Sequence, residues 1–193
     1  MSRVLTEKHE IFLDALKRKK AFMDPYSIKT INEPSEGVKM VAVKQNPRSI
    51  LSIENPSEAL QLAAVGKNPN SAELIKHIEN PSEEVQLTAV KKNGDVIKYI
   101  KNPSEEVQLA AVKQYFNSFE EIKIFEIKES VKEYIVSKDA NLLFMFENPS
   151  EDLKMIAINK DHYVITRLKN PSVELVEQAM KIDKKKKQQN DEN

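Results

Sequence analysis

Adjacent carboxylates recur along the chain, and paired acids are the residues that general acid–base catalysis uses. The pairs are Glu83/Glu84, Glu105/Glu106 and Glu151/Asp152. A general acid needs a pKa raised by burial or by a neighbouring like charge. Each pair instead falls where we expect the first turn of a helix, whose dipole stabilises the ionised carboxylate. We interpret the pairs as helix-capping residues, predict no catalytic residue, and expect a protein that is not an enzyme.

Other residue types that carry chemistry are sparse. The three histidines, His9, His77 and His162, share no metal-ligand spacing. The chain has no cysteine, which removes disulfides, thiolate metal ligands and a thiol nucleophile. Its three glycines are too scattered for a phosphate-binding loop. We therefore predict neither a metal site nor a cofactor, and the missing cysteine agrees with a reducing, cytoplasmic location.

The composition describes a globular chain with no overall charge preference. Of 193 residues, 40% are hydrophobic and 31% are charged. Lys+Arg and Asp+Glu both number 30, so any charged binding surface must arise from segregation of charge within the molecule. No stretch reaches the roughly 20 apolar residues of a transmembrane helix, and the first residues lack the apolar core of a signal peptide. We expect a cytoplasmic protein without a membrane partner.

One motif recurs along the chain and predicts its fold. ENPSEALQLAAV at 54–65 returns as ENPSEEVQLTAV at 79–90 and KNPSEEVQLAAV at 101–112, with weaker copies at 32–43, 147–158 and 169–180. The motif prolines are Pro34, Pro56, Pro81, Pro103, Pro149 and Pro171. An eroded copy with Ile127 in the proline position makes the spacings 22, 25, 22, 24, 22 and 22 residues. The sequence therefore predicts about seven structural repeats.

Each repeat is predicted to begin with an α-helix. In the segment 102–105, Asn102 is expected to be the N-cap, Pro103 the first helical residue and Glu105 a capping-box partner. Apolar residues four, six, eight and nine positions after the proline define the buried side, as in Leu60, Leu62, Ala64 and Val65. An Asn or Asp twelve positions after the proline is expected to end the helix in the left-handed conformation, most clearly at Asn93-Gly94.

A second, shorter helix is predicted to follow. Apolar residues stand six and three positions before the next proline, as in Ile50/Ile53 and Ile97/Ile100. In the eroded copy these positions are Glu121 and Ile124, and Ile122 is expected to substitute for Glu121. This spacing on so short a segment predicts one or two turns, partly of 3₁₀ type.

A single repeat of this length cannot be stable alone. Its six apolar anchors contribute about 1.5–3 kcal/mol each when buried, whereas ordering each residue costs about 1.5 kcal/mol. Neighbouring repeats must therefore share one core. We expect an all-α fold, a right-handed α-solenoid of about seven two-helix repeats over residues 28–182. Residues 1–27 would carry a capping helix at 4–23 with Phe12, Leu13, Leu16 and Phe22, and residues 183–193 a disordered charged tail.

The motif Asn-Pro-Ser-Glu-Glu-Val-x-Leu-Ala-Ala-Val, followed by a short Ile-x-x-Ile helix, resembles the leucine-rich repeat variant. This is a HEAT-like family in which α-helices alternate with 3₁₀ helices. The resemblance covers about 28–182, although arginine is common in that family where Gln61, Gln86 and Gln108 stand here. Asn-Pro-Ser-Glu repeats are also similar to those of phage and bacterial proteins. The likeness leaves open whether the protein is viral or cellular. If it is viral, the likeness implies a protein that sequesters or blocks a host protein, such as an immune effector, in the host cytoplasm.

Two sets of exposed residues are candidates for binding a partner. Outward positions on and after the short helices, which line the concave side in HEAT-like proteins, hold Ser52, Lys76, His77, Lys98, Tyr99, Lys101, Arg167 and Lys169. A basic ridge at the ends of the first helices holds Lys44, Lys67, Lys91, Lys92, Lys113, Lys138 and Lys160. Complementarity to the helix dipole also explains this ridge.

We expect a non-enzymatic scaffold that binds another protein. The alternative is a nucleic-acid-binding protein that uses the basic ridge, because regularly spaced lysines can follow a phosphate backbone. The sequence leaves open the identity of the partner, the surface that binds it and the oligomeric state.

Overall fold

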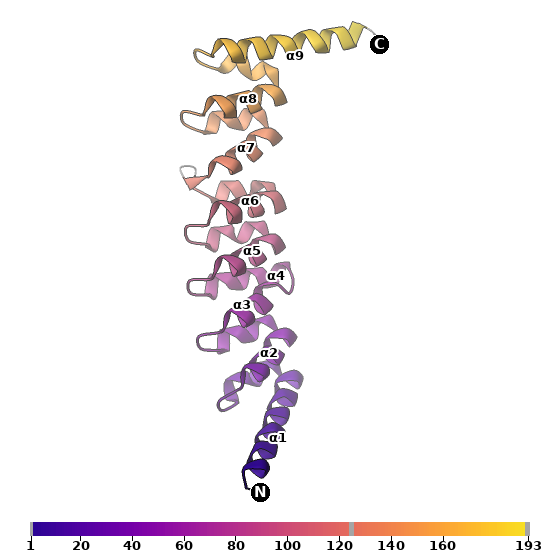
Figure 1. Cartoon of the computed structure of the whole chain (residues 1–193), viewed down its shortest axis with the longest axis vertical. Helices are drawn as coiled ribbons and strands as arrows, with labels where there is room; N and C mark the ends of the chain where they lie inside the picture. The colour runs from indigo at the N-terminus through magenta and orange to yellow at the C-terminus, as the bar shows by residue number, and fades with distance from the viewer. Residues whose placement is uncertain (1, 124–125, 192–193) are drawn as a thin grey trace. The chain divides into compact units, whose positions relative to one another are not determined.

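The computed structural model describes residues 2–123 and 126–191, and this part of the chain folds into helices with no strand (Figure 1). The predicted all-α class is confirmed. The chain divides into two compact units, Met1–Glu121 and Ile122–Asn193, which are described separately below. This division falls inside the predicted repeat region, and the boundaries predicted at 27/28 and 182/183 stay predictions.

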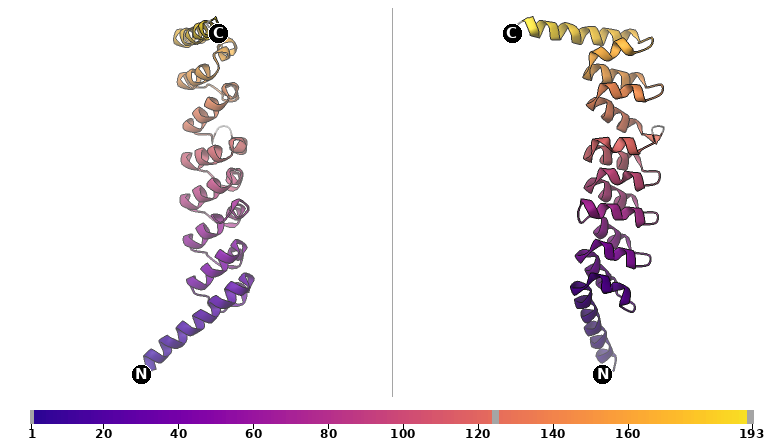
Figure 2. Two further views of the ribbon diagram at one scale, coloured as in Figure 1. Left: turned by 90° about the vertical axis from the view of Figure 1, so that its right-hand side faces the viewer. Right: turned by 180° about the vertical axis from the view of Figure 1, so that it is seen from behind.

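Unit 1 alternates long and short helices after a long first helix, α1 (Ser2–Met23). The further α-helices are α2 (Glu36–Gln45), α3 (Glu58–Val65), α4 (Pro69–Ala72), α5 (Glu83–Lys92) and α6 (Glu105–Gln114). The 3₁₀ helices are η1 (Pro25–Thr30), η2 (Pro47–Ser52), η3 (Glu73–His77), η4 (Gly94–Tyr99) and η5 (Phe116–Glu121). Long helices pack on long helices and short helices on short helices, so unit 1 has two rows (Figure 2). The predicted 3₁₀ character of the short helices is confirmed.

Unit 2 repeats this alternation. Its elements are α7 (Glu129–Lys138), η7 (Ala140–Met145), α8 (Glu151–Lys160), η8 (His162–Arg167) and α9 (Val173–Asp191). Helix α8 packs against both α7 and α9. Helix α9 continues through residues 183–191, so the disordered tail predicted there is wrong for these residues; residues 192–193 lie outside the described part.

The loop before each long helix differs from the prediction. Asn102 is not the N-cap: it has a φ of 51°, and every non-glycine residue with positive φ in the described chain precedes a motif proline. The N-cap is the serine after the proline, because Ser104 Oγ accepts the backbone N–H of Val107 at 3.3 Å. Asn tolerates the left-handed conformation better than most residues do. The asparagine therefore turns the chain, and the serine begins the helix.

The residue twelve positions after each proline does not end the long helix in the left-handed conformation, as was predicted. Asn46 has a φ of −135°, which is extended rather than left-handed, and its side chain accepts the Arg48 N–H at 3.0 Å to cap η2. Asn93 caps η4 in the same way. Gly94 has no positive φ; a Cβ there would lie 2.4 Å from the carbonyl oxygen of Ala111. Glycine is needed at this position for a close approach of two repeats, not for a helix stop.

The core follows the repeat pattern. Residues four, eight and nine positions after the proline are buried, as in Leu60, Ala64 and Val65, except that Met180 in the last repeat is exposed. Leu62 in the sixth position is half-buried. The short helices bury their apolar pair, as in Ile97 and Ile100. At about 1.5–3 kcal/mol for each large side chain, this burial is the main stabilising contribution.

Two repeats depart from the regular pattern. In the eroded repeat, Lys128 replaces the capping serine and its side chain makes no capping bond to α7, but Ile127 and Val131 are buried. The substitution of Ile122 is confirmed by its burial, whereas Ile124 lies outside the described residues. In the 25-residue repeat, the additional residues form the one-turn helix α4 before η3.

The terminal helix α1 covers the residues of the predicted capping helix, but the four apolar residues expected to pack against the rest of unit 1 are exposed. Phe12, Leu13, Leu16 and Phe22 are all exposed, whereas Ala21 is fully buried. No helix in the described part of the chain is long and apolar enough to cross a membrane.

Candidate functional site

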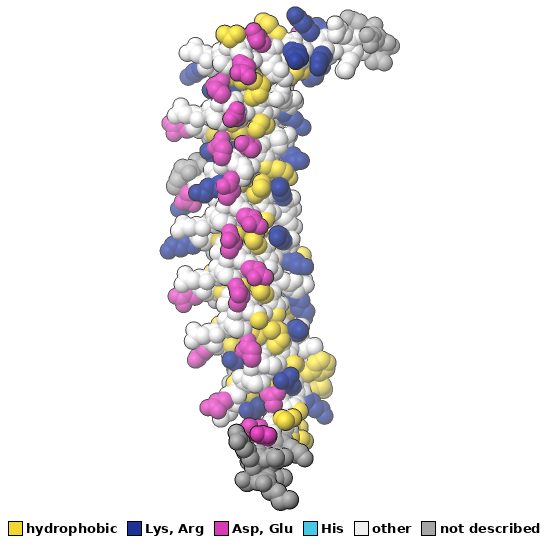
Figure 3. All heavy atoms as spheres, in the orientation of Figure 1, with side chains coloured by type: hydrophobic (Ala, Val, Ile, Leu, Met, Phe, Trp, Pro, Cys, Tyr) yellow, Lys and Arg dark blue, Asp and Glu magenta, His cyan; other side chains and the backbone are white. Residues whose placement is uncertain are grey.

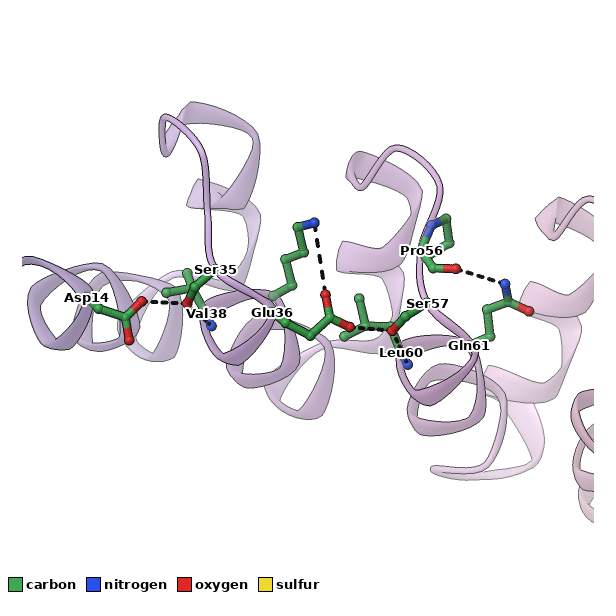
Figure 4. Close-up of polar contacts among 9 residues, drawn as sticks. Asp14, Ser35, Glu36, Val38, Pro56, Ser57, Leu60 and Gln61 are labelled. Carbon is green, nitrogen blue, oxygen red and sulfur yellow. Dashed lines mark hydrogen bonds and ion pairs between the residues drawn. The ribbon is translucent and has the colours of Figure 1, made fainter. Parts of the chain in front are cut away.

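A ladder of serine–carboxylate bonds joins consecutive repeats. Ser57 Oγ donates to the carboxylate of Glu36 in the preceding repeat and accepts the Leu60 N–H at 3.4 Å (Figure 4). The same arrangement gives the pairs Asp14–Ser35, Glu58–Ser82 and Glu83–Ser104 in unit 1, and Glu129–Ser150 and Glu151–Ser172 in unit 2. One serine thus begins its own helix and binds the helix before it.

This ladder contains one carboxylate from each of two pairs that first suggested catalysis, Glu83 and Glu151. Hydrogen bonds from Lys154 and Ser172 lower the pKa of Glu151 below its ordinary value. Hydrogen bonds from Ser35 and Arg18 similarly lower the pKa of Asp14. A general acid requires the opposite shift. In these two residues the environment favours the ionised, structural form.

A recurring glutamine, Gln61, Gln86 or Gln108, holds three of the asparagine–proline loops. Gln61 Nε2 donates to the carbonyl oxygen of Pro56 at 2.9 Å (Figure 4), and Gln86 does the same to Pro81 at 2.9 Å. The sequence signal for this bond was the return of glutamine five residues after the proline, but its role depends on the fold of the loop. These glutamines are therefore structural and do not belong to a binding surface.

The exposed face of the short helices in unit 1 gathers five of the predicted binding residues. Lys76, His77, Lys98, Tyr99 and Lys101 are all exposed, Tyr99 by 39%. The Nζ atoms of Lys76 and Lys98 each lie 5.4 Å from the centroid of the Tyr99 ring. Tyr99 is therefore an aromatic side chain between two cations, within cation–π distance of both.

Acidic residues of the same short helices partly neutralise these cations. Lys76 Nζ lies 3.6 Å from a carboxylate oxygen of Glu73, and Lys98 donates to Asp95. The bond to Asp95 raises the pKa of Lys98, which keeps that ammonium group charged. These pairs are exposed and solvent-screened, so a partner carboxylate can compete for the lysines.

A cavity of about 270 Å³ lies beside this face, between η2 and the α4–η3 segment. Its lining includes Arg48, Leu51, Leu74 and His77, and Leu51 is 50% exposed. The segment α4–η3 that forms one wall belongs to the longer 25-residue repeat. Arg48 and Leu51 were not predicted from the sequence, although the irregular spacing indicated the repeat that forms the cavity.

Two further predicted binding residues, Arg167 and Lys169, belong to unit 2, whereas Ser52 is exposed at the end of η2 in unit 1. Arg167 Nη1 donates to Asn141 Oδ1 at 2.6 Å, and its guanidinium carbon lies 3.8 Å from the centroid of the Phe144 ring. Lys169 is exposed in the loop that follows η8. The predicted binding residues therefore lie on two surfaces, one in unit 1 and one in unit 2, which are described separately.

The basic ridge is exposed at every predicted lysine, and Figure 3 shows basic side chains gathered along one edge of unit 1. In unit 1, Lys67 Nζ donates to the carbonyl oxygens of Lys44 and Gln45 at 2.6 and 2.7 Å, where α2 ends. In unit 2, Lys138 Nζ lies 5.1 Å from the Tyr134 ring centroid. Lys67 thus satisfies the last carbonyl groups of the preceding helix, as expected for a basic residue at a helix C-terminus.

The three histidines have different surroundings. His9 and His77 are exposed, whereas His162 is buried, with Nε2 3.6 Å from Asp183 Oδ1 and Nδ1 3.4 Å from Lys186 Nζ. Within residues 2–123 and 126–191, no group of three His, Asp or Glu side chains is placed to hold a metal ion.

No known protein family, curated protein or solved structure matches this chain. The likeness to the leucine-rich repeat variant therefore depends on the motif residues alone. Any function must be argued from the surfaces described above.

Proposed function

We propose that this chain is a non-enzymatic repeat scaffold, a right-handed α-solenoid of the leucine-rich repeat variant type, that binds another protein. The observation that carries this proposal is Tyr99, exposed between Lys76 and Lys98 on the short-helix face of unit 1. Tyrosine and arginine are enriched among residues that dominate protein–protein binding energies. The repeat framework is constant, while this exposed face differs from repeat to repeat.

The cavity beside η2 supports a protein partner over a small polar ligand. Its exposed Leu51 offers apolar contact, and Arg48 and His77 stand on its lining. Lys76, which also lines the cavity, lies within cation–π distance of Tyr99 and so connects the two features. We infer that the partner segment inserts an apolar side chain here and presents carboxylates to the surrounding cations.

The finer proposal is that the bound protein is a host factor, such as an immune effector, blocked by a phage-type inhibitor in the host cytoplasm. Its support is the similarity of the Asn-Pro-Ser-Glu repeats to those of phage proteins. A scaffold without catalytic groups acts on a partner by occupying its surface, which is the mode that an inhibitor of this kind requires.

The second candidate function is nucleic-acid binding along the basic ridge. The observation in its favour is the return of exposed lysines, such as Lys44, Lys91 and Lys113, at the ends of successive helices in unit 1. The capping bonds of Lys67 weaken this candidate, because they give one ridge lysine a structural role.

The two functions are separated by a quantitative pulldown with two matched fourfold variants. The face variant carries Lys76→Ala, Lys98→Ala, Tyr99→Ala and Lys101→Ala; the ridge variant carries Lys44→Gln, Lys91→Gln, Lys92→Gln and Lys113→Gln. We expect a stoichiometric protein partner with the wild type and the ridge variant, and at least about tenfold weaker binding by the face variant. Retention of the partner by the face variant would overturn this choice of surface. Steeply salt-dependent DNA or RNA retardation, lost in the ridge variant, would support the nucleic-acid alternative.

A further inference from the structure

Helix α1 carries two opposite stripes of different chemistry. The inner stripe contains Asp14, Lys17 and Ala21: Asp14 binds Ser35, Lys17 Nζ donates to the Asn32 carbonyl oxygen at 2.9 Å, and Ala21 is fully buried. A second stripe, His9, Phe12, Leu16, Lys19 and Met23, is displaced by two residues and so by about 200° around the helix. Figure 2 shows the end of α1 that leads into η1 beside the rest of unit 1, and the N-terminal end of the helix extending beyond it.

The outward stripe is apolar at its centre and exposed. Phe12 is 60% exposed, Leu16 48% and Met23 75%. Ile11 and Phe22 on one flank and Leu13 on the other are exposed by 70%, 56% and 41%. Six large apolar side chains on one helix are more than the scattered exposed residues of an ordinary monomer, and such patches mark interaction sites.

The charges of α1 are segregated in the same way. Its described acids, Glu7, Glu10 and Asp14, follow one another at intervals of three and four residues, which places them on the inner side. The outward stripe instead contains His9 and Lys19, both exposed, and no acid. The chain as a whole is neutral, but this face is apolar and basic, so the surface that complements it is anionic.

The charge of Lys19 disfavours a second copy of the chain as the occupant. An antiparallel pair of α1 helices centred between Phe12 and Leu16 would place Lys19 of each copy in the contact, with no acid of either outward stripe to pair with it. Burying an unpaired ammonium group is unfavourable.

The breadth of the apolar face separates the two anionic occupants that remain, a protein groove and a lipid surface. From Phe22 through Phe12 to Leu13 the exposed apolar residues cover about 180° of the helix circumference. A helix bound in a groove buries anchors at intervals of three and four residues on one side, which would leave the flanking residues in water. A lipid interface covers the whole outward half of a helix that lies in its plane.

We propose that α1 docks unit 1 onto an anionic lipid surface, with Phe12, Leu16, Phe22 and Met23 in the acyl–headgroup boundary. The ammonium group of Lys19 reaches the headgroup phosphates while its alkyl stem lies along the apolar side chains. The inner stripe stays bound to α2 and η1 through Asp14, Lys17 and Lys20, so the helix need not leave unit 1 to reach the surface. The docking is peripheral and spans no bilayer, but it departs from the expectation of no membrane partner, which was based on the lack of an apolar stretch long enough to span one.

The test is co-sedimentation of the full chain with vesicles of phosphatidylcholine containing about 30% phosphatidylglycerol, against vesicles of phosphatidylcholine alone. We expect binding to the anionic vesicles only, weakened by high salt because the attraction is partly electrostatic. The double variant Phe12→Gln/Leu16→Gln should bind at least about tenfold more weakly, because two large apolar contacts are lost. Lys19→Gln should bind about fivefold more weakly.

A matched control uses exposed apolar residues of the other terminal helix. Val173→Gln/Met180→Gln changes side chains that are 75% and 59% exposed on α9, and it should leave vesicle binding unchanged. Circular dichroism and the melting temperature establish that all variants are folded.

Three results would overturn the proposal: no binding to anionic vesicles, equal binding to neutral vesicles, or equal loss in the α9 control. Concentration-dependent dimerisation abolished by Phe12→Gln/Leu16→Gln, without vesicle binding, would assign the face to a second copy instead. The proposal is independent of the short-helix face, because the face variant with Ala at 76, 98, 99 and 101 should sediment like the wild type.

Discussion

Helices α1 and α9 are both long terminal helices, but they are attached to their units by different interactions. Helix α9 buries Leu175 and Ala179 against Ile158 of α8. Helix α1 buries Ala21 and is otherwise held by the polar contacts of Asp14, Lys17 and Lys20, while its large apolar residues face away. Both helices are amphipathic in sequence, yet only α9 uses its apolar side to close a unit. The difference teaches that an apolar helix face is not by itself evidence of core packing.

The largest effect is expected from the apolar attachment of α9. Leu175→Ala should lower the free energy of unfolding by about 2–5 kcal/mol, because it leaves a cavity against Ile158. Denaturant unfolding followed by circular dichroism measures this change. Met180→Ala on the same helix is the control and should change stability by less than about 0.5 kcal/mol. Equal effects of the two substitutions would contradict the assignment of the inner side of α9.

A smaller effect is expected at the single buried alanine of α1. Ala21→Gln inserts a long polar side chain into a fully buried position and should destabilise the α1–α2 contact by about 1–3 kcal/mol. Ala15→Gln, at an exposed position of the same helix, is the matched control. Hydrogen exchange of the α1 amides should rise in the first variant only; an equal rise in both would show that α1 is not held through Ala21.

The pH dependence of the α1 attachment should follow Asp14. Its pKa is lowered in the folded protein by the bonds from Ser35 and Arg18, so its contribution to stability is complete above its ordinary pKa. That contribution is lost as the pH falls through the lowered value, which lies below about pH 4. Hydrogen exchange or proteolysis of α1 should therefore increase in acid in the wild type, whereas Asp14→Asn should show a weakened attachment at neutral pH and less change in acid. If α1 were held as strongly in Asp14→Asn as in the wild type at neutral pH, Asp14 would not contribute to the attachment.

The smallest effect on folding stability is expected for Phe12→Gln and Leu16→Gln, the substitutions expected to weaken lipid docking most. In the absence of lipid, Phe12→Gln and Leu16→Gln should each change the free energy of unfolding by less than about 0.5 kcal/mol, because both side chains are exposed. Thermal unfolding in dilute buffer measures this. A clear loss of stability that depends on protein concentration would mean that a second copy covers this face in solution.

Much of the repeat architecture was predictable because the motif recurs along the sequence at a nearly constant interval. The spacing of the prolines located the long helix of every repeat, including α7, whose repeat has lost the motif, and Ile122 is buried as predicted. The cap was misassigned because Asn102 and Ser104 are both good N-cap residues, and only the backbone shows which of them adopts a φ of 51°. The serine–carboxylate ladder was not foreseen, since each bond joins residues 21 to 24 positions apart.

The candidate surfaces were predictable in part for the same reason. Periodicity shows which positions point outward, and Lys76, Lys98 and Tyr99 are exposed as expected. Periodicity does not show which outward residues meet, so Arg48 and Leu51 entered only when η2 and the α4–η3 segment were seen to enclose a cavity.

The sequence by itself determined an all-α repeat chain without cysteine, with a burial pattern set by side-chain spacing. Only the tertiary structure decided that Ser104 caps its helix, that Gly94 makes room for Ala111, and that Phe12 and Leu16 point away from unit 1. The physical reason is that hydrophobic periodicity acts within one helix, whereas each of these outcomes depends on the atoms that a neighbouring segment places beside it.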